Sequence, residues 1–184
     1  MTTAAATDIV RIGAKLYAEN PEVIDLGAYI PLFHRWIQGR GLDGVPIDVA
    51  DYAHVPDGPG VMLIGDEADR AIDLGEGRPG VVYQRKRHGE GSLEDRFAAS
   101  IEAVDRAATE IEVDPAAAGV RFGRDEILVR VNDRRLAPNE DATLDALRPS
   151  LEGALARVRP GRTAEITRVL DDPSGPFAAR VRIL

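Results

Sequence analysis

Near the N-terminus, apolar and polar residues alternate along residues 9–18 (IVRIGAKLYA). Ile12, Ala14 and Leu16 fall on one side of this run, and Lys15 falls on the other. A period of two residues is typical of a strand that buries one face and exposes the other. The pattern therefore predicts a half-buried strand, which Asn20-Pro21 should end.

Three later segments carry apolar residues at helical spacing, at about residues 22–38, 92–114 and 142–158. The middle segment has the clearest apolar stripe, formed by Phe97, Ile101, Val104, Ala108 and Ile111. Ser92-x-x-Asp95 at its start resembles a capping box in which Asp takes the place of the usual Glu or Gln. These segments predict three helices.

Short apolar runs bounded by Gly, Pro, Asn or Asp predict the remaining strands. They lie at residues 45–49, 61–64, 71–74, 81–83, 120–122, 127–131, 163–169 and 178–183. Three helices and about eight strands predict an α+β fold, in which the helices pack on one face of a mixed sheet. At 184 residues the chain is expected to be one globular domain, residues 1–184.

An internal repeat organises these elements. Leu26-x-Ala28-x-x-Pro31-x-Phe33-x-x-x-Ile37 recurs as Leu144-x-Ala146-x-x-Pro149-x-Leu151-x-x-x-Leu155. Each copy leads to a strand and then to a similar turn, Pro-Asp-Gly-Pro at 56–59 and Pro-Ser-Gly-Pro at 173–176. We interpret the pattern as a duplicated β-α-β-β unit covering about 9–66 and 126–184, joined by a strand-helix-strand segment at 71–123.

Proline stands at the same place in both repeated helices, as Pro31 and Pro149. A proline inside a helix removes one backbone hydrogen bond and disturbs the preceding turn, whereas the first turn tolerates it. The matched prolines therefore predict that each helix either kinks or begins later than its apolar spacing suggests.

Composition limits the classes of function. The formal net charge is −8 and cysteine is absent, so disulfides, thiolate metal sites and cysteine nucleophiles are excluded. The acidic balance disfavours nucleic acid as a partner. The sequence shows neither an apolar run of membrane-spanning length nor a secretory signal. Many Arg, Ala, Gly and Pro residues with only two Lys favour a GC-rich bacterial source, and we expect a cytoplasmic protein.

The first candidate site is an acidic loop between residues 48 and 73. Carboxylates and an imidazole gathered on loops can hold a divalent cation or serve as acid and base. The metal candidates are Asp51, His54, Asp57 and Asp66, and the catalytic candidates are His54, Asp51, Asp57 and Tyr52. In the alternative interpretation the loop is solvated and its aspartates bond the backbone of their own turns.

A second candidate is the basic strand end Arg85-Lys86-Arg87-His88, which runs through two glycines into a helix start. Free N–H groups and the helix dipole favour anions at such a place. The anion candidates are Arg85, Arg87, Gly89, Gly91 and Ser92. Glu90, Glu94 and Asp95 already supply negative charge there, so an ordinary capped helix is the competing interpretation.

A third polar segment, Asn132-Asp133-Arg134-Arg135, follows a strand and has the composition of a polar turn. It could instead pair with the acidic loop or with a partner chain. Serine is scarce and does not stand in a hydrolase motif. No cofactor-binding motif is recognised in the sequence.

The sequence shows no resemblance to a characterised family, so function is inferred from the pattern alone. The first hypothesis is a non-enzymatic module that binds another protein or a second copy of itself, for which an edge strand such as 178–183 could pair across a dimer. The second is a ligand or metal site, or an enzyme, around Asp51–Asp66. The third is anion or nucleic-acid binding through Arg85–His88 and Arg134-Arg135. The sequence leaves open whether catalysis occurs and whether any small molecule binds.

Overall fold

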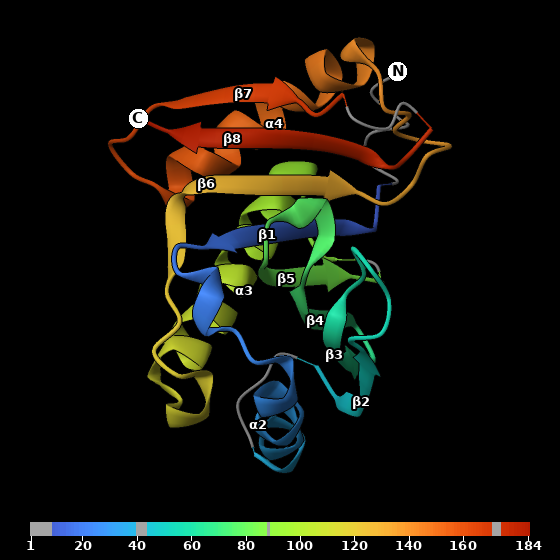
Figure 1. Ribbon diagram of the computed structural model, residues 1–184. Coiled ribbons are helices and arrows are strands. Elements are labelled where there is room, and N and C mark those ends of the chain that lie inside the picture. Colours follow the sequence, from blue (N-terminus) through green and yellow to red (C-terminus); the bar gives the residue numbers. More distant parts are fainter. Residues whose placement is uncertain (1–8, 40–43, 88, 171–173) are drawn as a thin grey trace.

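The computed structural model describes residues 9–39, 44–87, 89–170 and 174–184. Figure 1 shows one broad, twisted sheet with helices behind and below it. The strands are β1 (Ile12–Ala18), β2 (Pro46–Tyr52), β3 (Gly60–Gly65), β4 (Ala68–Asp73), β5 (Gly80–Arg85), β6 (Phe122–Val131), β7 (Ala164–Arg168) and β8 (Phe177–Ile183). The helices are α2 (Leu26–Gln38), α3 (Leu93–Val113) and α4 (Asp141–Val158), with 3-10 turns η1 (Pro21–Val23), η2 (Gly75–Gly77) and η3 (Pro115–Ala117).

These elements confirm the predicted α+β class, but the sheet is antiparallel and not mixed. Its order is β2-β3-β4-β5-β1-β6-β8-β7, and every pairing is antiparallel. The prediction of a mixed sheet was wrong because strands joined through a helix do not become neighbours. β1 and β2, β5 and β6, and β6 and β7 run parallel to one another, but other strands lie between the members of each pair.

The same order corrects the expected dimer edge. β8, which includes residues 178–183, is paired on both sides, with β6 and with β7. The edges of the sheet are β2 and β7 instead.

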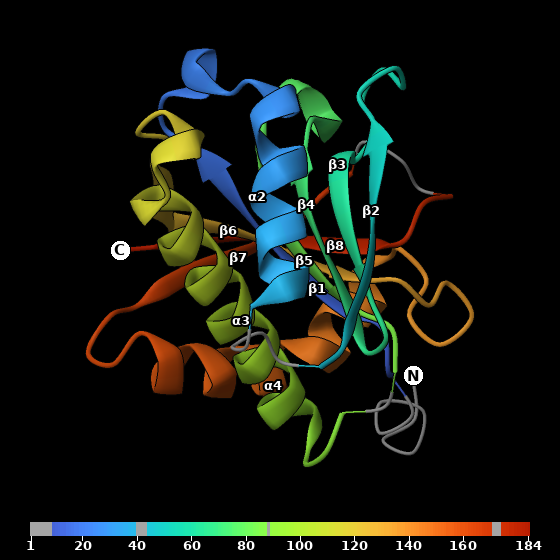
Figure 2. The same ribbon diagram turned by 90° about the horizontal axis from the view of Figure 1, so that it is seen from below.

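All three helices lie on one face of the sheet, as predicted (Figure 2). α3 packs on the central strands β1 and β5, α2 covers β2 and β3, and α4 lies beside α3 and over β7. The main apolar cluster fills the space between the layers, with Leu16, Phe33, Phe97 and Phe177 nearly or fully excluded from solvent. Among the described residues, the opposite face of the sheet carries no α-helix; we call it the open face.

Local sequence explains where the helices begin. The side chain of Ser92 accepts a hydrogen bond from the Asp95 backbone N–H, and the Asp95 carboxylate accepts one from Ser92, so the predicted capping box opens α3. Asp25 caps α2 by accepting from Gly27. Pro31 and Pro149 lie inside α2 and α4, so the proline does not mark the first turn of either helix.

The two predicted repeat copies contain the same elements in the same order, β1-α2-β2-β3 and β6-α4-β7-β8. In both, the strand after the helix forms an edge of the sheet and the next strand pairs with it. The copies differ because β4 and β5 separate β3 from β1, whereas β8 is next to β6. Common order is not proof of common ancestry, and the duplication stays a prediction.

No helix within the described ranges combines the length and the apolar character needed to cross a bilayer.

Candidate ligand-binding site

Three residues of one cross-strand row on the open face, Gln84, Arg130 and Ala178, line a pocket. Gly13 on β1 stands between Gln84 on β5 and Arg130 on β6, and Arg130 is paired in turn with Ala178 on β8. A side chain at residue 13 would collide with Gln84, because a Cβ there would lie 2.4 Å from the Gln84 carboxamide oxygen. The Gln84 carboxamide therefore lies over Gly13 on one side of Arg130, and the small Ala178 lines the pocket on the other side.

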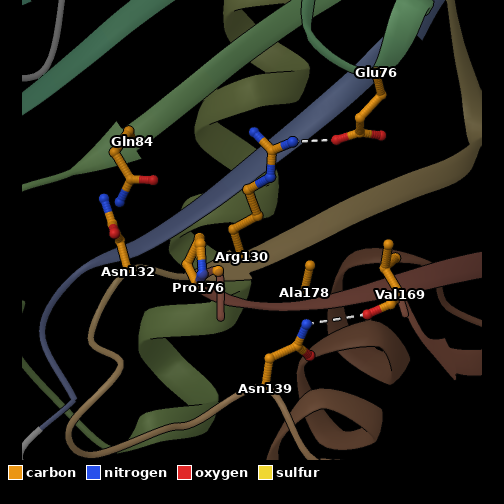
Figure 3. Close-up of a pocket in the computed structure, with 9 residues that line it drawn as sticks. Glu76, Gln84, Arg130, Asn132, Asn139, Val169, Pro176 and Ala178 are labelled. Carbon is orange, nitrogen blue, oxygen red and sulfur yellow. Dashed lines mark hydrogen bonds and ion pairs between the residues drawn. The ribbon is translucent and has the colours of Figure 1, made fainter. Parts of the chain in front are cut away.

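The resulting pocket, here called the open-face pocket, has a volume of about 380 Å³. Figure 3 shows Arg130 in its middle, with the carboxamides of Gln84 and Asn132 turned toward each other on one side. Asn139 lies on another side and donates to the Val169 carbonyl at 3.2 Å. The lining residues are Glu76, Gln84, Arg130, Asn132, Asn139, Val169, Gly175, Pro176 and Ala178.

One rim of the pocket is η2, which a buried lysine holds against the sheet. Lys15 on β1 is 1% exposed even though it belongs to the polar side of the predicted alternation. Its ammonium group donates to Asp73 at 2.5 Å and to the Gly75 carbonyl at 2.9 Å. Burial lowers the pKa of Lys15 below its ordinary value, and this effect exceeds the opposing attraction of Asp73.

Glu76, at the centre of η2, has a strained backbone. Its φ of 67° lies in the left-handed region, which costs a residue other than glycine about 1 kcal/mol or more. Its carboxylate accepts hydrogen bonds from Arg130 and, at 3.0 Å, from the Tyr17 hydroxyl. These bonds offset the strain and fix the rim. Burial, followed by the nearby Glu76 charge, raises the pKa of Tyr17 to about 12.

The chemistry of the lining favours binding. Three carboxamides line the pocket, and Gln84 and Asn139 each already donate one hydrogen bond, to the Arg85 and Val169 carbonyls; Arg130 is neutralised by Glu76. Among the described residues that line the pocket, there is no His, Ser, Thr, Lys or Tyr that could act as nucleophile or general base. Glu76 is the single carboxylate among them and is held by two donors. The arrangement can orient a polar ligand but offers no acid–base pair.

The predicted acidic site does not assemble as one group. Asp51, Tyr52, His54 and Asp57 lie at one end of the β2–β3 hairpin, and Asp66 lies at the other end, paired with Arg87 at 2.5 Å. Residues 53–59 form the turn of this hairpin, whereas Asp66 follows the last residue of β3. The length of β3 therefore separates Asp66 from the other four residues. Across the described ranges, no set of three or more His, Asp or Glu residues is placed to share a metal ion.

The catalytic candidates of this loop have local structural roles. Asp51 accepts from the Ala53 backbone N–H at 2.8 Å, as expected in the solvated-loop interpretation. Asp57 occupies a left-handed position of the turn, with φ of 52°. The rings of Tyr52 and His54 lie 6.5 Å apart on the surface. Among the described residues, no hydrogen bond joins His54 to Asp51 or to Asp57.

The basic strand end is largely compensated by carboxylates. Arg85 pairs with Glu67 at 3.3 Å and Lys86 with Asp69 at 2.7 Å. Gly91 provides the positive φ that leads into α3, and Ser92 is engaged with Asp95 in the capping box. Gly89 packs beside Arg96 and Arg85. The N-terminus of α3 thus already holds the Asp95 carboxylate; His88 lies outside the described residues.

The third polar segment lies next to the open-face pocket. Asn132 lines that pocket and also a second hollow, formed by Arg134, Arg135 and Arg11 among others. Sequence reasoning singled out Asn132–Arg135 but missed Gly13, Glu76, Gln84, Arg130 and Asn139. A glycine inside an alternating strand was the one available signal, because it often marks a close approach or an open space.

Comparison of the chain with models of protein families, with curated proteins and with solved structures finds no match.

Proposed function

We propose that the protein binds a small, uncharged, hydrogen-bonding molecule in the open-face pocket and does not act on it chemically. The supporting observation is the convergence of three carboxamides, from Gln84, Asn132 and Asn139, around the neutralised Arg130. Composition is our reason for placing this activity in a bacterial cytoplasm.

The ligand class follows from the charge and size of the pocket. Carboxamides match partners that offer both donor and acceptor edges, such as amides and sugars. Val169, Pro176 and Ala178 add an apolar side, as in most small-molecule sites. A volume of about 380 Å³ lies at the small end of typical ligand pockets. An anion would meet Glu76, and a cation would meet Arg130, so a neutral molecule fits best.

The proposal predicts that carboxamide removal weakens the binding of neutral probes. Acetamide, nicotinamide and N-acetylglucosamine would be titrated while the side-chain NH₂ signals of isotope-labelled protein are followed by NMR. In the wild type, the signals of Gln84, Asn132 and Asn139 should shift. Gln84→Ala or Asn132→Ala should each weaken the best probe about fivefold, since each hydrogen bond contributes about 1 kcal/mol.

The matched control is Gln38→Ala, which removes an exposed carboxamide at the end of α2 on the helical face. It should leave every titration unchanged. Probe shifts that map outside the open-face pocket, or that Gln38→Ala reduces equally, would refute the assignment of this pocket.

A second candidate function is self-association through β2. This strand is an unpaired edge of the sheet, and it begins beside two exposed aliphatic side chains, Val45 (65% exposed) and Ile47 (60% exposed). Exposed edges with apolar side chains are templates for strand pairing. A second copy related by a two-fold axis would place β2 against β2.

This candidate predicts a concentration-dependent dimer that Ile47→Lys converts to monomer, because a charge on the edge opposes strand pairing. Sedimentation velocity over a concentration series gives the measurement. Val113→Lys is the control, since Val113 is 76% exposed at the end of α3, away from the edge. A wild type that is monomeric at all concentrations would rule the candidate out.

A further inference from the structure

We propose that a second hollow, the arginine pocket, binds a short phosphate chain such as a di- or triphosphate group. It is lined by Val10, Arg11, Lys86, Asn132, Asp133, Arg134 and Arg135 and has a volume of about 700 Å³. Among the described lining residues, the two pockets share only Asn132, so the inference does not depend on the function proposed above.

The fold brings these residues together from three places in the chain. Arg11 precedes β1, Lys86 follows β5, and residues 132–135 follow β6, so all lie at one end of the three central strands. The Asn132 backbone N–H donates to the Arg11 carbonyl at 2.8 Å, which fastens the two segments side by side. Arg11 and the pair Arg134-Arg135 are thereby presented to one hollow by different segments.

The loop that carries the arginines is pre-organised. The Asp133 carboxylate accepts from the Leu136 backbone N–H at 3.2 Å, and the Ala137 N–H donates to the Asp133 carbonyl at 2.8 Å. Arg134 also donates to the Ser174 carbonyl at 3.3 Å. The one carboxylate in the lining thus shapes the turn, and an anion would not require the loop to fold anew.

The charges of the hollow are unusual for this chain. Its described lining residues include four positive side chains and one negative side chain, although the net charge of the chain is −8. Lys86 is paired with Asp69. Within the described ranges, Arg11, Arg134 and Arg135 have no carboxylate partner, whereas Arg35, Arg124 and Arg159 each have one. Three exposed guanidinium groups are therefore available to an anion.

Phosphate oxygens are the anions that this chemistry fits best. The planar guanidinium group binds phosphate through two parallel hydrogen bonds. Three such groups around a hollow of this size can neutralise the charges of two or three consecutive phosphate groups. A nucleic-acid strand fits less well, because the net charge of the chain, −8, opposes a long polyanion and the described lining residues include no aromatic ring for base stacking.

The test is isothermal titration of the full chain with sodium tripolyphosphate at low salt. We expect binding that weakens as NaCl is added. Arg134→Gln and Arg135→Gln should each reduce affinity about tenfold, because hydrogen bonds to charged groups contribute about 1.5 kcal/mol or more. Both variants are exposed substitutions in a loop and should keep the wild-type circular dichroism spectrum.

The matched control is Arg121→Gln, which changes the net charge equally at the opposite end of β6. It should leave tripolyphosphate affinity within about twofold of wild type. Loss of affinity equal to that of Arg134→Gln would show a general charge effect and overturn the proposal. So would the absence of heat with wild type, or binding of a single-stranded oligonucleotide without binding of tripolyphosphate.

Discussion

Asp73→Ala is expected to lower the free energy of unfolding by about 3–5 kcal/mol, the largest effect of any single substitution considered for this protein. The reason is the ammonium group of Lys15, which is 1% exposed and has Asp73 as its charged partner at 2.5 Å. Without the carboxylate, Lys15 retains the Gly75 carbonyl as a hydrogen-bond acceptor and the Tyr17 ring at 5.3 Å, but no carboxylate in direct contact among the described residues. The folded state would then contain a buried charge that is solvated in the unfolded state. Urea unfolding at neutral pH measures the difference.

Asp69→Ala provides the matched control on the same strand. Asp69 also pairs with a lysine, Lys86, at 2.7 Å, but the Lys86 side chain is 36% exposed. Pairs in contact with water contribute about 0–1 kcal/mol, and Asp69 also accepts from the Gly65 backbone N–H at 3.2 Å, so this variant should lose about 1–2 kcal/mol, less than Asp73→Ala. Equal losses for Asp69→Ala and Asp73→Ala would contradict the importance of burial.

Replacing both Lys15 and Asp73 distinguishes the loss of the ion pair from the cost of leaving one buried charge without its partner. The double variant Lys15→Met, Asp73→Val keeps the volume but removes both charges, and it should recover most of the stability lost in Asp73→Ala. It should also release η2, because Met cannot donate to Gly75. In the double variant we therefore expect weaker probe binding in the open-face pocket, whose rim includes Glu76.

The sequence was sufficient to predict the elements of the fold because its patterns are local. Period-two and helical spacing placed the three helices and most strands, and the capping box at Ser92 was visible from two residues. The pairing order was not predictable in this way. Whether β2 joins β1 directly or crosses to the far edge depends on which hairpins form between them, and that is a tertiary choice.

The two strands predicted at 120–122 and 127–131 are not separate elements. Residues 123–125, which lie between them and include Gly123 and Asp125, belong to the single strand β6. The register with β1 jumps there, from Leu16 opposite Ile127 to Ala18 opposite Phe122. A bulge uses the same residue types as a turn, since both need backbone that leaves the regular ladder. The Arg124 side chain is held nearby by Glu112.

The open-face pocket could not be predicted, for a different physical reason. Alternation in β1 assigned Lys15 to a solvent-facing side, yet η2 covers it. The sequence of a strand does not reveal that a turn far along the chain covers one of its faces. The pocket also depends on a cross-strand row through Gly13 and Arg130, which becomes a row only when the register is known.

Raising the pH above 10 is expected to destabilise the protein steeply. Burial is the main cause that raises the pKa values of Tyr17 and Tyr29 from 10.0 to about 12. Between these values the unfolded chain loses two protons that the folded protein keeps, so the folded state loses stability as the pH rises. The loss should reach about 2 kcal/mol for each tyrosine near pH 12.

Lys15 has the opposite effect on the pH dependence of stability, because its pKa is lowered and not raised. Its pKa is lowered in the folded protein from an ordinary value of 10.5. Between its lowered pKa in the folded protein and 10.5, the unfolded chain binds this proton and the folded protein releases it, so this group makes stability rise with pH in that window. The contribution of Lys15 to the free energy of unfolding should thus increase as the pH approaches 10, and the contribution of the two tyrosines should fall above it. Urea unfolding at a series of pH values measures this profile.

Two variants, Tyr17→Phe and Tyr29→Phe, test whether these tyrosines cause the loss of stability above pH 10. Tyr17→Phe removes a titrating hydroxyl together with its hydrogen bond to Glu76, so it should lower stability at pH 7 and flatten the fall above pH 10. Tyr29→Phe removes a buried hydroxyl that has no partner among the described residues. It should flatten the fall equally without a loss at pH 7, because no hydrogen bond is broken. If both variants kept the full wild-type decline between pH 10 and 12, burial of these two tyrosines would not be its cause.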